Sequence, residues 1–152
     1  MYNSNRTGRN MDNRTRSTLI LSQPEPIIGD NTWRSPGVYV VELDPKLTEN
    51  IDYTSGSAVY TGLDTIQIEI VSTVSTKATN ANTTVLMTTG IEGVEDTTQE
   101  IKHTLTSGNE DKELTHQGVH EWKTGETLDF FIKADSNITI EKAVWKIKRY
   151  DV

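Results

Sequence analysis

Regular alternation of apolar residues near the end of the chain constrains the fold more than any other sequence feature. Leu128, Phe130, Ile132 and Ala134 recur at every second position within residues 127–134. A period of two is expected of a β-strand that buries one face. The run therefore predicts a strand in a sheet that packs on one side against a core.

A second alternating run follows after a polar break. Its apolar residues are Ile138 and Ile140, then Ala143, Trp145 and Ile147. The positions change from even to odd between Ile140 and Ala143, and a strand needs an extra residue to make that change. We therefore predict a β-bulge or bend near Glu141–Lys142.

Short strands separated by turns rich in Gly, Asn and Asp are predicted through the rest of residues 53–152. They lie near Ala58–Tyr60, Thr65–Thr73, Thr83–Thr88, Glu100–Thr106, Gly118–Lys123, Thr127–Ala134, Asn137–Lys142 and Ala143–Arg149. No segment of about ten residues repeats its apolar positions every 3.6 residues, which argues against substantial helix. This pattern predicts an all-β sandwich, with a jelly roll as the favoured topology.

The first 52 residues differ in character and predict an extended N-terminal arm in front of a head at residues 53–152. Residues 1–17 contain almost no apolar side chains, and Pro24 and Pro26 interrupt strand pairing. Only 34% of the 152 residues are hydrophobic. That share fits a domain of roughly 100 residues with an arm better than one globule that uses the whole chain. Removal of residues 1–44 is then expected to leave a folded head.

The first 18 residues of the arm are basic, although the whole chain carries a net charge of −7. They contain Arg6, Arg9, Arg14 and Arg16 against a single acidic residue, Asp12. A basic arm on an acidic body favours docking of the arm on an acidic partner, and a solvated terminus is the alternative. The acidic body argues against nucleic acid as a partner, because phosphate binding needs concentrated Lys and Arg.

Three apolar groups in the arm are candidates for partner contacts. They are the run Leu19, Ile20 and Leu21, the single Trp33, and the segment Val38, Tyr39 and Val40. The first run could add as a strand to the edge of a partner's sheet. A large aromatic residue in an extended segment suits an anchor on a partner's surface. The third group lies in a predicted strand, Val38–Leu43, that follows a Pro-Gly turn.

Three segments at the end of the chain carry a family resemblance. They are S-G-N at 107–109, T-G-E-T-L-D-F-F-I-K-A-D-S-N-I-T-I at 124–140 and A-V-W-K-I-K-R-Y at 143–150. Together they resemble the end of the trimeric jelly rolls of the C1q/tumour-necrosis-factor kind, over residues 53–152. Small tailed-phage fibre, head-fibre and capsid-decoration proteins use such modules. The resemblance implies a homotrimeric head in a bacteriophage virion protein.

The aromatic residues of the predicted head divide between core and surface. Phe131 points away from Phe130 in an alternating strand, so we assign it to an oligomer interface. Trp145 is in phase with the predicted core. Trp122 is interpreted as a core residue, and a platform that stacks on a sugar ligand is the alternative.

Catalytic and metal-binding patterns are not recognised in the sequence. His116 and His120 have a zinc-like spacing, but on a strand such residues lie about 13 Å apart, so loop or surface histidines are expected. The absence of cysteine excludes disulfides and thiol chemistry. There is no glycine-rich phosphate loop, nucleophile elbow or calcium loop. We expect no enzyme activity, metal or cofactor.

Membrane and export signals are also not recognised. No apolar run approaches the roughly 18 residues of a membrane helix, so no membrane partner is expected. The first residues lack the apolar core of a signal peptide, so secretory export is not expected.

These features favour a structural virion protein on the capsid surface, as a capsid-decoration, head-fibre or tail-associated component. The arm would bind the major capsid protein or another virion protein, and the head would stabilise the particle or attach to a host-surface glycan. A stand-alone carbohydrate-binding β-sandwich is the alternative, and it requires an exposed Trp122. An enzyme that uses two of the acidic residues ranks last.

Overall fold

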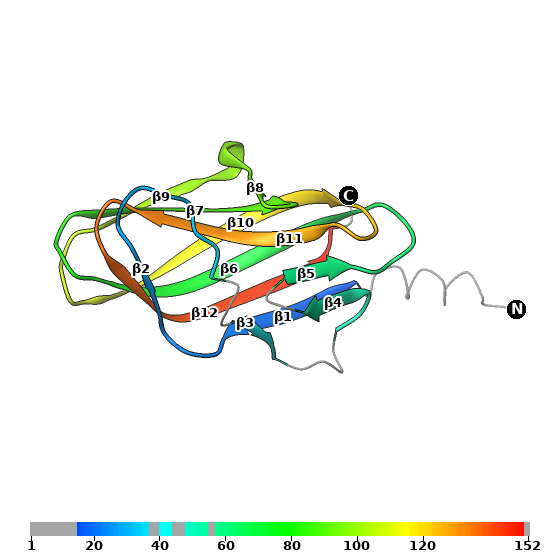
Figure 1. Ribbon diagram of the computed structural model, residues 1–152, viewed down its shortest axis with the longest axis horizontal. Helices are drawn as coiled ribbons and strands as arrows, with labels where there is room; N and C mark the ends of the chain where they lie inside the picture. Colours follow the sequence, from blue (N-terminus) through cyan, green and yellow to red (C-terminus); the bar gives the residue numbers. More distant parts are fainter. Residues whose placement is uncertain (1–14, 37–39, 44–47, 55–56, 151–152) are drawn as a thin grey trace, which may run out of the picture.

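The computed structural model describes residues 15–36, 40–43, 48–54 and 57–150, which form two stacked antiparallel sheets (Figure 1). The strands are β1 (Arg16–Leu21), β2 (Glu25–Ile27), β3 (Val40–Glu42), β4 (Ile51–Thr54), β5 (Ser57–Tyr60), β6 (Ile66–Ala78), β7 (Thr83–Ile91), β8 (Val94–Glu95), β9 (Ile101–Leu105), β10 (Asp111–Trp122), β11 (Thr127–Ala134) and β12 (Ile138–Arg149). Within these residues a short 3-10 helix, η3 (Thr97–Gln99), precedes β9. In this part of the chain, no helix is long and apolar enough to cross a membrane.

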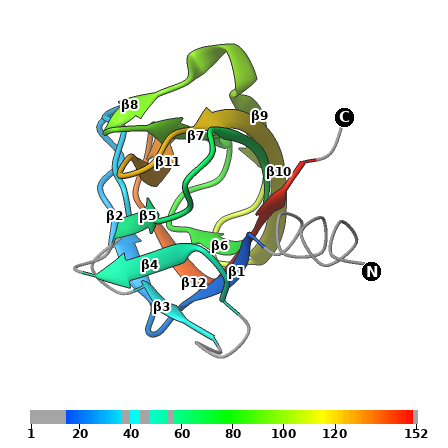
Figure 2. The same ribbon diagram turned by 90° about the vertical axis from the view of Figure 1, so that its right-hand side faces the viewer.

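Each sheet is built around one of the two strands at the end of the chain. The β12 sheet has the order β10-β6-β12-β1-β3, and β2 also pairs with β12. The β11 sheet has the order β4-β5-β11-β7-β8, and β9 also pairs with β7. An end-on view shows the two layers enclosing the core (Figure 2).

The strand pairs nest inside one another along the chain. β1 pairs with β12, β5 with β11, β6 with β10, and β7 with β9, all antiparallel. Nested pairs of this kind arise when one long hairpin is rolled into two sheets, which is the jelly-roll topology. The prediction of an all-β jelly-roll sandwich is confirmed.

Alternating side chains from both sheets fill the space between them. Two aromatic stacks lie in this core. Phe130 and Trp145 have ring centroids 4.7 Å apart, and Tyr60 and Trp122 have centroids 5.3 Å apart. Each of the four side chains is at most 5% exposed. The stacks join the β11 sheet to the β12 sheet, because each takes one ring from each sheet.

The clearest sequence patterns match the structure closely. β11 has the predicted bounds, and the register of β12 with β6 shifts between Ile140 and Lys142, which confirms the predicted bulge. The two runs on either side of this bulge form one continuous strand rather than two. β6 and β10 are each longer than predicted.

The structure corrects the predicted boundary between arm and head for residues 15–52. β1 lies inside the β12 sheet, with Leu19 opposite Trp145 and Ile20 opposite Val144. Leu19 is 0% exposed and Val40 is 3% exposed. The apolar run therefore adds to this chain's own sheet, where its inward residues complete the core, and β1 gives β12 a hydrogen-bonding partner.

The same finding reassigns several predicted partner contacts. Leu19, Leu21 and Val40 are buried in the core, so they are not available to a partner. Ile20 and Arg16 point outward on β1. Arg6, Arg9, Arg14, Val38 and Tyr39 lie outside the described residues.

Leu19→Ala is expected to lower the free energy of unfolding by about 2–5 kcal/mol, because it leaves a cavity between the sheets. Leu43→Ala is the matched control, because Leu43 is 59% exposed. Its expected effect is within about 0.5 kcal/mol. Urea unfolding followed by tryptophan fluorescence measures both. Equal effects of the two substitutions would contradict the placement of β1 in the core.

Candidate functional site

Apolar side chains form a connected strip on the outer face of the β12 sheet. Ile20 lies opposite Val41 on β3 and opposite Val144 on β12. Val144 in turn lies opposite Thr73 on β6, and Val71, which lies opposite Lys146, is a diagonal neighbour of Val144. Directly opposite residues on adjacent strands are close enough for their side chains to touch. We call Ile20, Val41, Val71 and Val144 the apolar face.

The apolar face, which extends from the end strand β3 across β1 and β12 to β6, is accessible. Val41 is 44% exposed, and Ile20, Val71 and Val144 are partly exposed. Beside it, Arg16, Lys146 and Lys148 line a shallow hollow on β1 and β12. Lys148 pairs with Glu69 at 3.5 Å. Outward-facing residues of a sandwich are ordinarily polar, so a connected apolar strip indicates a contact surface.

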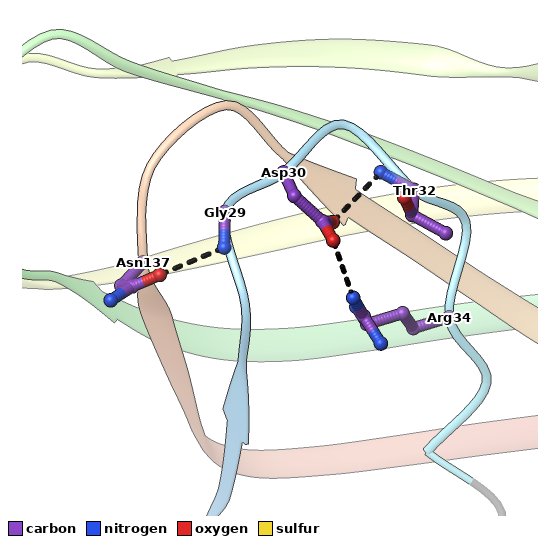
Figure 3. A network of polar contacts seen from close by, with 5 residues as sticks. All are labelled: Gly29, Asp30, Thr32, Arg34 and Asn137. Atoms are coloured by element: carbon purple, nitrogen blue, oxygen red, sulfur yellow. Dashed lines mark hydrogen bonds and ion pairs between the residues drawn. The ribbon is translucent and has the colours of Figure 1, made fainter.

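Trp33 lies on a strap, residues 28–36, that crosses from one sheet to the other. β2 before the strap pairs with β12, whereas Arg34 exchanges two backbone hydrogen bonds of 2.9 Å with Ile132 on β11. The Gly29 N–H donates to the Asn137 side chain at 2.9 Å (Figure 3). A Cβ at Gly29 would lie 1.9 Å from the Ser136 backbone, so the strap can approach the turn between β11 and β12 this closely only with glycine there.

An Asp30-centred turn holds the strap in shape. The Arg34 guanidinium donates to the Asp30 carboxylate at 2.7 Å, and the Thr32 N–H donates to its other oxygen at 3.2 Å (Figure 3). The Trp33 and Phe131 rings lie edge to face, with their centroids 6.5 Å apart. The Lys133 ammonium lies 4.8 Å from the centroid of the Trp33 ring. Trp33 and Phe131 therefore contact each other within one chain, and both remain partly exposed, so their assignments to a partner contact and an oligomer interface stay predictions.

Trp122 is fully buried, whereas the carbohydrate-binding alternative requires it to be exposed. Its side chain is 0% exposed and its ring stacks on Tyr60. The indole N–H donates to the carbonyl of Glu126 at 2.9 Å. Trp122 therefore has no free ring face for a sugar, and the core interpretation holds.

His116 and His120 lie between the sheets, where they make a polar cluster. They project inward from β10 in phase with Leu114 and Trp122, and are 4% and 9% exposed. This corrects the expectation of loop or surface histidines. His120 Nε2 is 2.6 Å from the Thr89 hydroxyl, and His116 Nε2 donates to the Gln99 carbonyl at 2.7 Å.

Gly118 lets the histidine-bearing strand lie close to β7. A Cβ at Gly118 would approach the Thr89 hydroxyl to 2.6 Å and the His116 ring to 3.2 Å. Burial lowers the pKa of His116, opposed by the hydrogen bond to Gln99 and assisted by His103. Burial also lowers the pKa of His120, opposed by Asp96 and assisted by His116. Both imidazoles are therefore held neutral near pH 7.

The histidine cluster does not form an accessible reaction centre. Thr89, His120 and Asp96 have the residue types of a nucleophile, base and orienting acid, but the Thr89 side chain is 0% exposed. Among the described residues, no group of three or more His, Asp or Glu is placed to hold a metal ion. The arrangement is suited to holding segments together rather than to turnover.

Several of these residues carried a signal that the sequence analysis missed. Val71 and Val144 are apolar residues at positions opposite in phase to the core residues of their strands. His116 and His120 are in phase with Leu114 and Trp122, a spacing that indicates inward-facing side chains. Gln99 carries no comparable signal, because its side chain bonds to Val119, 20 residues away in sequence.

The free energy of unfolding is expected to fall as the pH is lowered from about 7.5 to about 5.5. The two lowered histidine pKa values mean that the unfolded chain, with its ordinary pKa of 6.5, binds protons that the folded chain does not. The contribution of the two histidines to the free energy of unfolding is therefore fully present above about pH 6.5. Below that pH it falls by up to about 1.4 kcal/mol per histidine for each pH unit. Urea titrations at several pH values measure the slope. A stability that is constant or rises on acidification would contradict the neutral buried pair.

No protein-family model and no curated protein sequence matches the chain. Solved structures share its fold. PRD1 vertex protein P5 has a TM-score of 0.65 at 9% identity, over 91% of this chain and 99% of that one. Eiger TNF from S. frugiperda has a TM-score of 0.54 at 8% identity, over 91% and 94% of the two chains. Murine APRIL has a TM-score of 0.54 at 13% identity, over 88% and 98%. At these identities the likeness shows the fold alone: the described chain is a jelly roll that resembles, over nearly its full length, a vertex protein and two proteins of the TNF type.

Proposed function

We propose that the chain is a structural protein of a virion surface, in which a homotrimeric jelly-roll head is attached to another virion protein by its basic N-terminal residues. The observation that carries the virion assignment is the fold match with PRD1 vertex protein P5, which extends over nearly all of both chains. A vertex protein, by its name, is part of a particle's surface. The described residues supply a folded head, the part that such a surface protein would expose.

The apolar face supports assembly of the head from copies of this chain. An apolar strip over β3, β1, β12 and β6 loses contact with water when a second copy covers it, and apolar burial stabilises association. The trimeric jelly rolls that the sequence resembles offer a symmetry in which each copy meets two others. In this proposal the interface between subunits is formed by Ile20, Val41, Val71 and Val144 rather than by Phe131.

The anchor is assigned to residues 1–14 rather than to the whole of residues 1–52. The first 14 residues carry Arg6, Arg9 and Arg14 against a single acidic residue, Asp12. From Thr15 onward the backbone is engaged with the head: the Thr15 carbonyl accepts a 2.8 Å hydrogen bond from the Arg149 N–H. A basic segment attached to an otherwise acidic chain is suited to an acidic surface on the major capsid protein or another virion protein.

Val144→Lys is expected to convert the trimer into a folded monomer, because it places a charge in the middle of the apolar face. Thr104→Lys is the matched control, since Thr104 is an exposed strand residue of the other sheet. Light scattering coupled to size exclusion gives the mass, and circular dichroism reports the fold. A wild-type chain that is monomeric at about micromolar concentration, or a Val144→Lys chain that stays trimeric, would contradict the assigned interface.

Deletion of residues 1–14 is expected to leave the melting temperature of the head unchanged and to abolish its incorporation into particles. Deletion of residues 1–44 is the contrasting variant, because it removes β1, β2 and β3 and is expected to abolish folding. Quantitative mass spectrometry of particles assembled with tagged chains counts the copies. Full occupancy by the chain that lacks residues 1–14 would contradict the anchor.

A further inference from the structure

On the outer edge of β10, the side-chain amide of Gln99 makes the two backbone hydrogen bonds that a neighbouring strand would make. β10 is the last strand of the β12 sheet, so its outward N–H and C=O groups have no strand partner in that sheet. The Gln99 side-chain amide fills this place at Val119: it donates to the Val119 carbonyl and accepts from the Val119 N–H, both at 2.8 Å. Four residues after Gln99, the ring of His103 reaches the Thr115 carbonyl at 3.4 Å. Unpaired strand edges invite pairing with other chains, so this cover has a clear physical role.

Gln99 is held in place by the buried His116 and by Asp96. Its carbonyl accepts from His116 Nε2 at 2.7 Å, and its side-chain N–H also donates to Asp96 at 2.7 Å. Asp96 is fixed in turn to β7, since its carbonyl accepts from the Thr88 hydroxyl at 2.6 Å and its N–H donates to the Thr89 carbonyl at 3.0 Å. The contacts form one chain of hydrogen bonds from β7 through residues 96–99 to the edge of β10.

A proton on this cluster would disrupt its geometry. Because His116 Nε2 donates to a carbonyl, the neutral ring has its lone pair on Nδ1, which is buried and has no hydrogen-bonding partner. Protonation at Nδ1 would bury a charged N–H without an acceptor, which is strongly unfavourable. The Thr89 hydroxyl can serve a neutral His120 as donor, and it would have to turn to accept from a protonated ring.

The charged groups around the pair do not compensate for two added protons. Asp96, from the segment after β8, is the acidic group that acts on His120, and His103 on β9 adds repulsion at His116. The inward residues of β6 opposite the pair are Ser72 and Ile68, and β7 contributes Thr88 and Thr89, all uncharged. One carboxylate therefore faces three imidazoles.

We propose that residues 96–103 form a latch on the edge of β10 that is closed at neutral pH and released by acid through His116 and His120. Release frees the Val119 N–H and carbonyl and exposes the edge of β10, while β6 still holds the strand on its other side. The latch is a property of the single folded chain and does not depend on the proposed virion role.

The size of the effect follows from proton linkage. Consider a histidine that binds its proton only in the released state, with the ordinary pKa of 6.5. It raises the equilibrium constant for release of the latch by about 30-fold at pH 5 and hardly at all at pH 7.5. The Val119 amide is expected to lose at least about tenfold of its protection from hydrogen exchange over this range. Protection means the intrinsic exchange rate at each pH divided by the observed rate, which removes the intrinsic pH dependence of exchange.

Hydrogen exchange followed by NMR on the full chain tests the latch at the Val119 amide, at about pH 7.5 and about pH 5. The acid-induced loss is expected in the wild type and in the control Thr104→Gln, which changes an exposed residue of β9 outside the latch. It is expected to be absent in the double variant His116→Gln/His120→Gln, whose side chains do not titrate. Gln99→Ala is expected to give low protection of Val119 at both pH values, with the amides of β6 unaffected.

Three results would overturn the latch. The first is a Val119 protection that is the same at both pH values in the wild type. The second is an acid response that persists in the double histidine variant. The third is full protection of Val119 in Gln99→Ala. Direct NMR titration of His116 and His120 in the wild type gives a test independent of the double variant's folding: midpoints at or above 6.5 would also refute the mechanism.

Discussion

The antiparallel pairing of β1 with β12 is the interaction on which the rest of the structure depends. It places Leu19 opposite Trp145, so the first described strand completes the core beneath the Phe130–Trp145 stack. It also places Ile20 opposite Val144 on the outside, and β3 then extends the strip with Val41. One strand pairing therefore creates both the buried interior and the exposed face through which we propose that copies of the chain associate.

Sequence periodicity predicted the fold where the inward residues are apolar and failed where they are polar. β11 and the bulge in β12 were predicted closely, because every inward residue there is apolar. β6 and β10 were predicted too short, since Ser72, Thr76, His116 and His120 occupy inward positions and interrupt the apolar alternation. Their hydroxyl and ring groups are accommodated by hydrogen bonds to distant segments, as between His120 and Thr89, which a local pattern does not contain.

The candidate contact residues were harder to predict than the fold. The prolines and the short apolar run in residues 18–26 suggested an arm, yet β1 lies against β12, more than 120 residues away in sequence. Trp33 looked uncovered because its contact, Phe131, lies far from it in sequence. A search for apolar residues out of phase with the core would have found Val71 and Val144, and it is these that give the head a distinctive outer surface.

The central claim is that this outer surface meets another copy of the chain, and its most direct test is chemical accessibility. The chain has no cysteine, so a single Val41→Cys substitution provides a unique thiol on the apolar face. Its rate of alkylation in the native protein is compared with that of Thr104→Cys on the opposite sheet. The account predicts slow labelling at position 41 that accelerates on dilution as the assembly dissociates, and rapid labelling at position 104 throughout. Equal, concentration-independent rates at the two positions would contradict it.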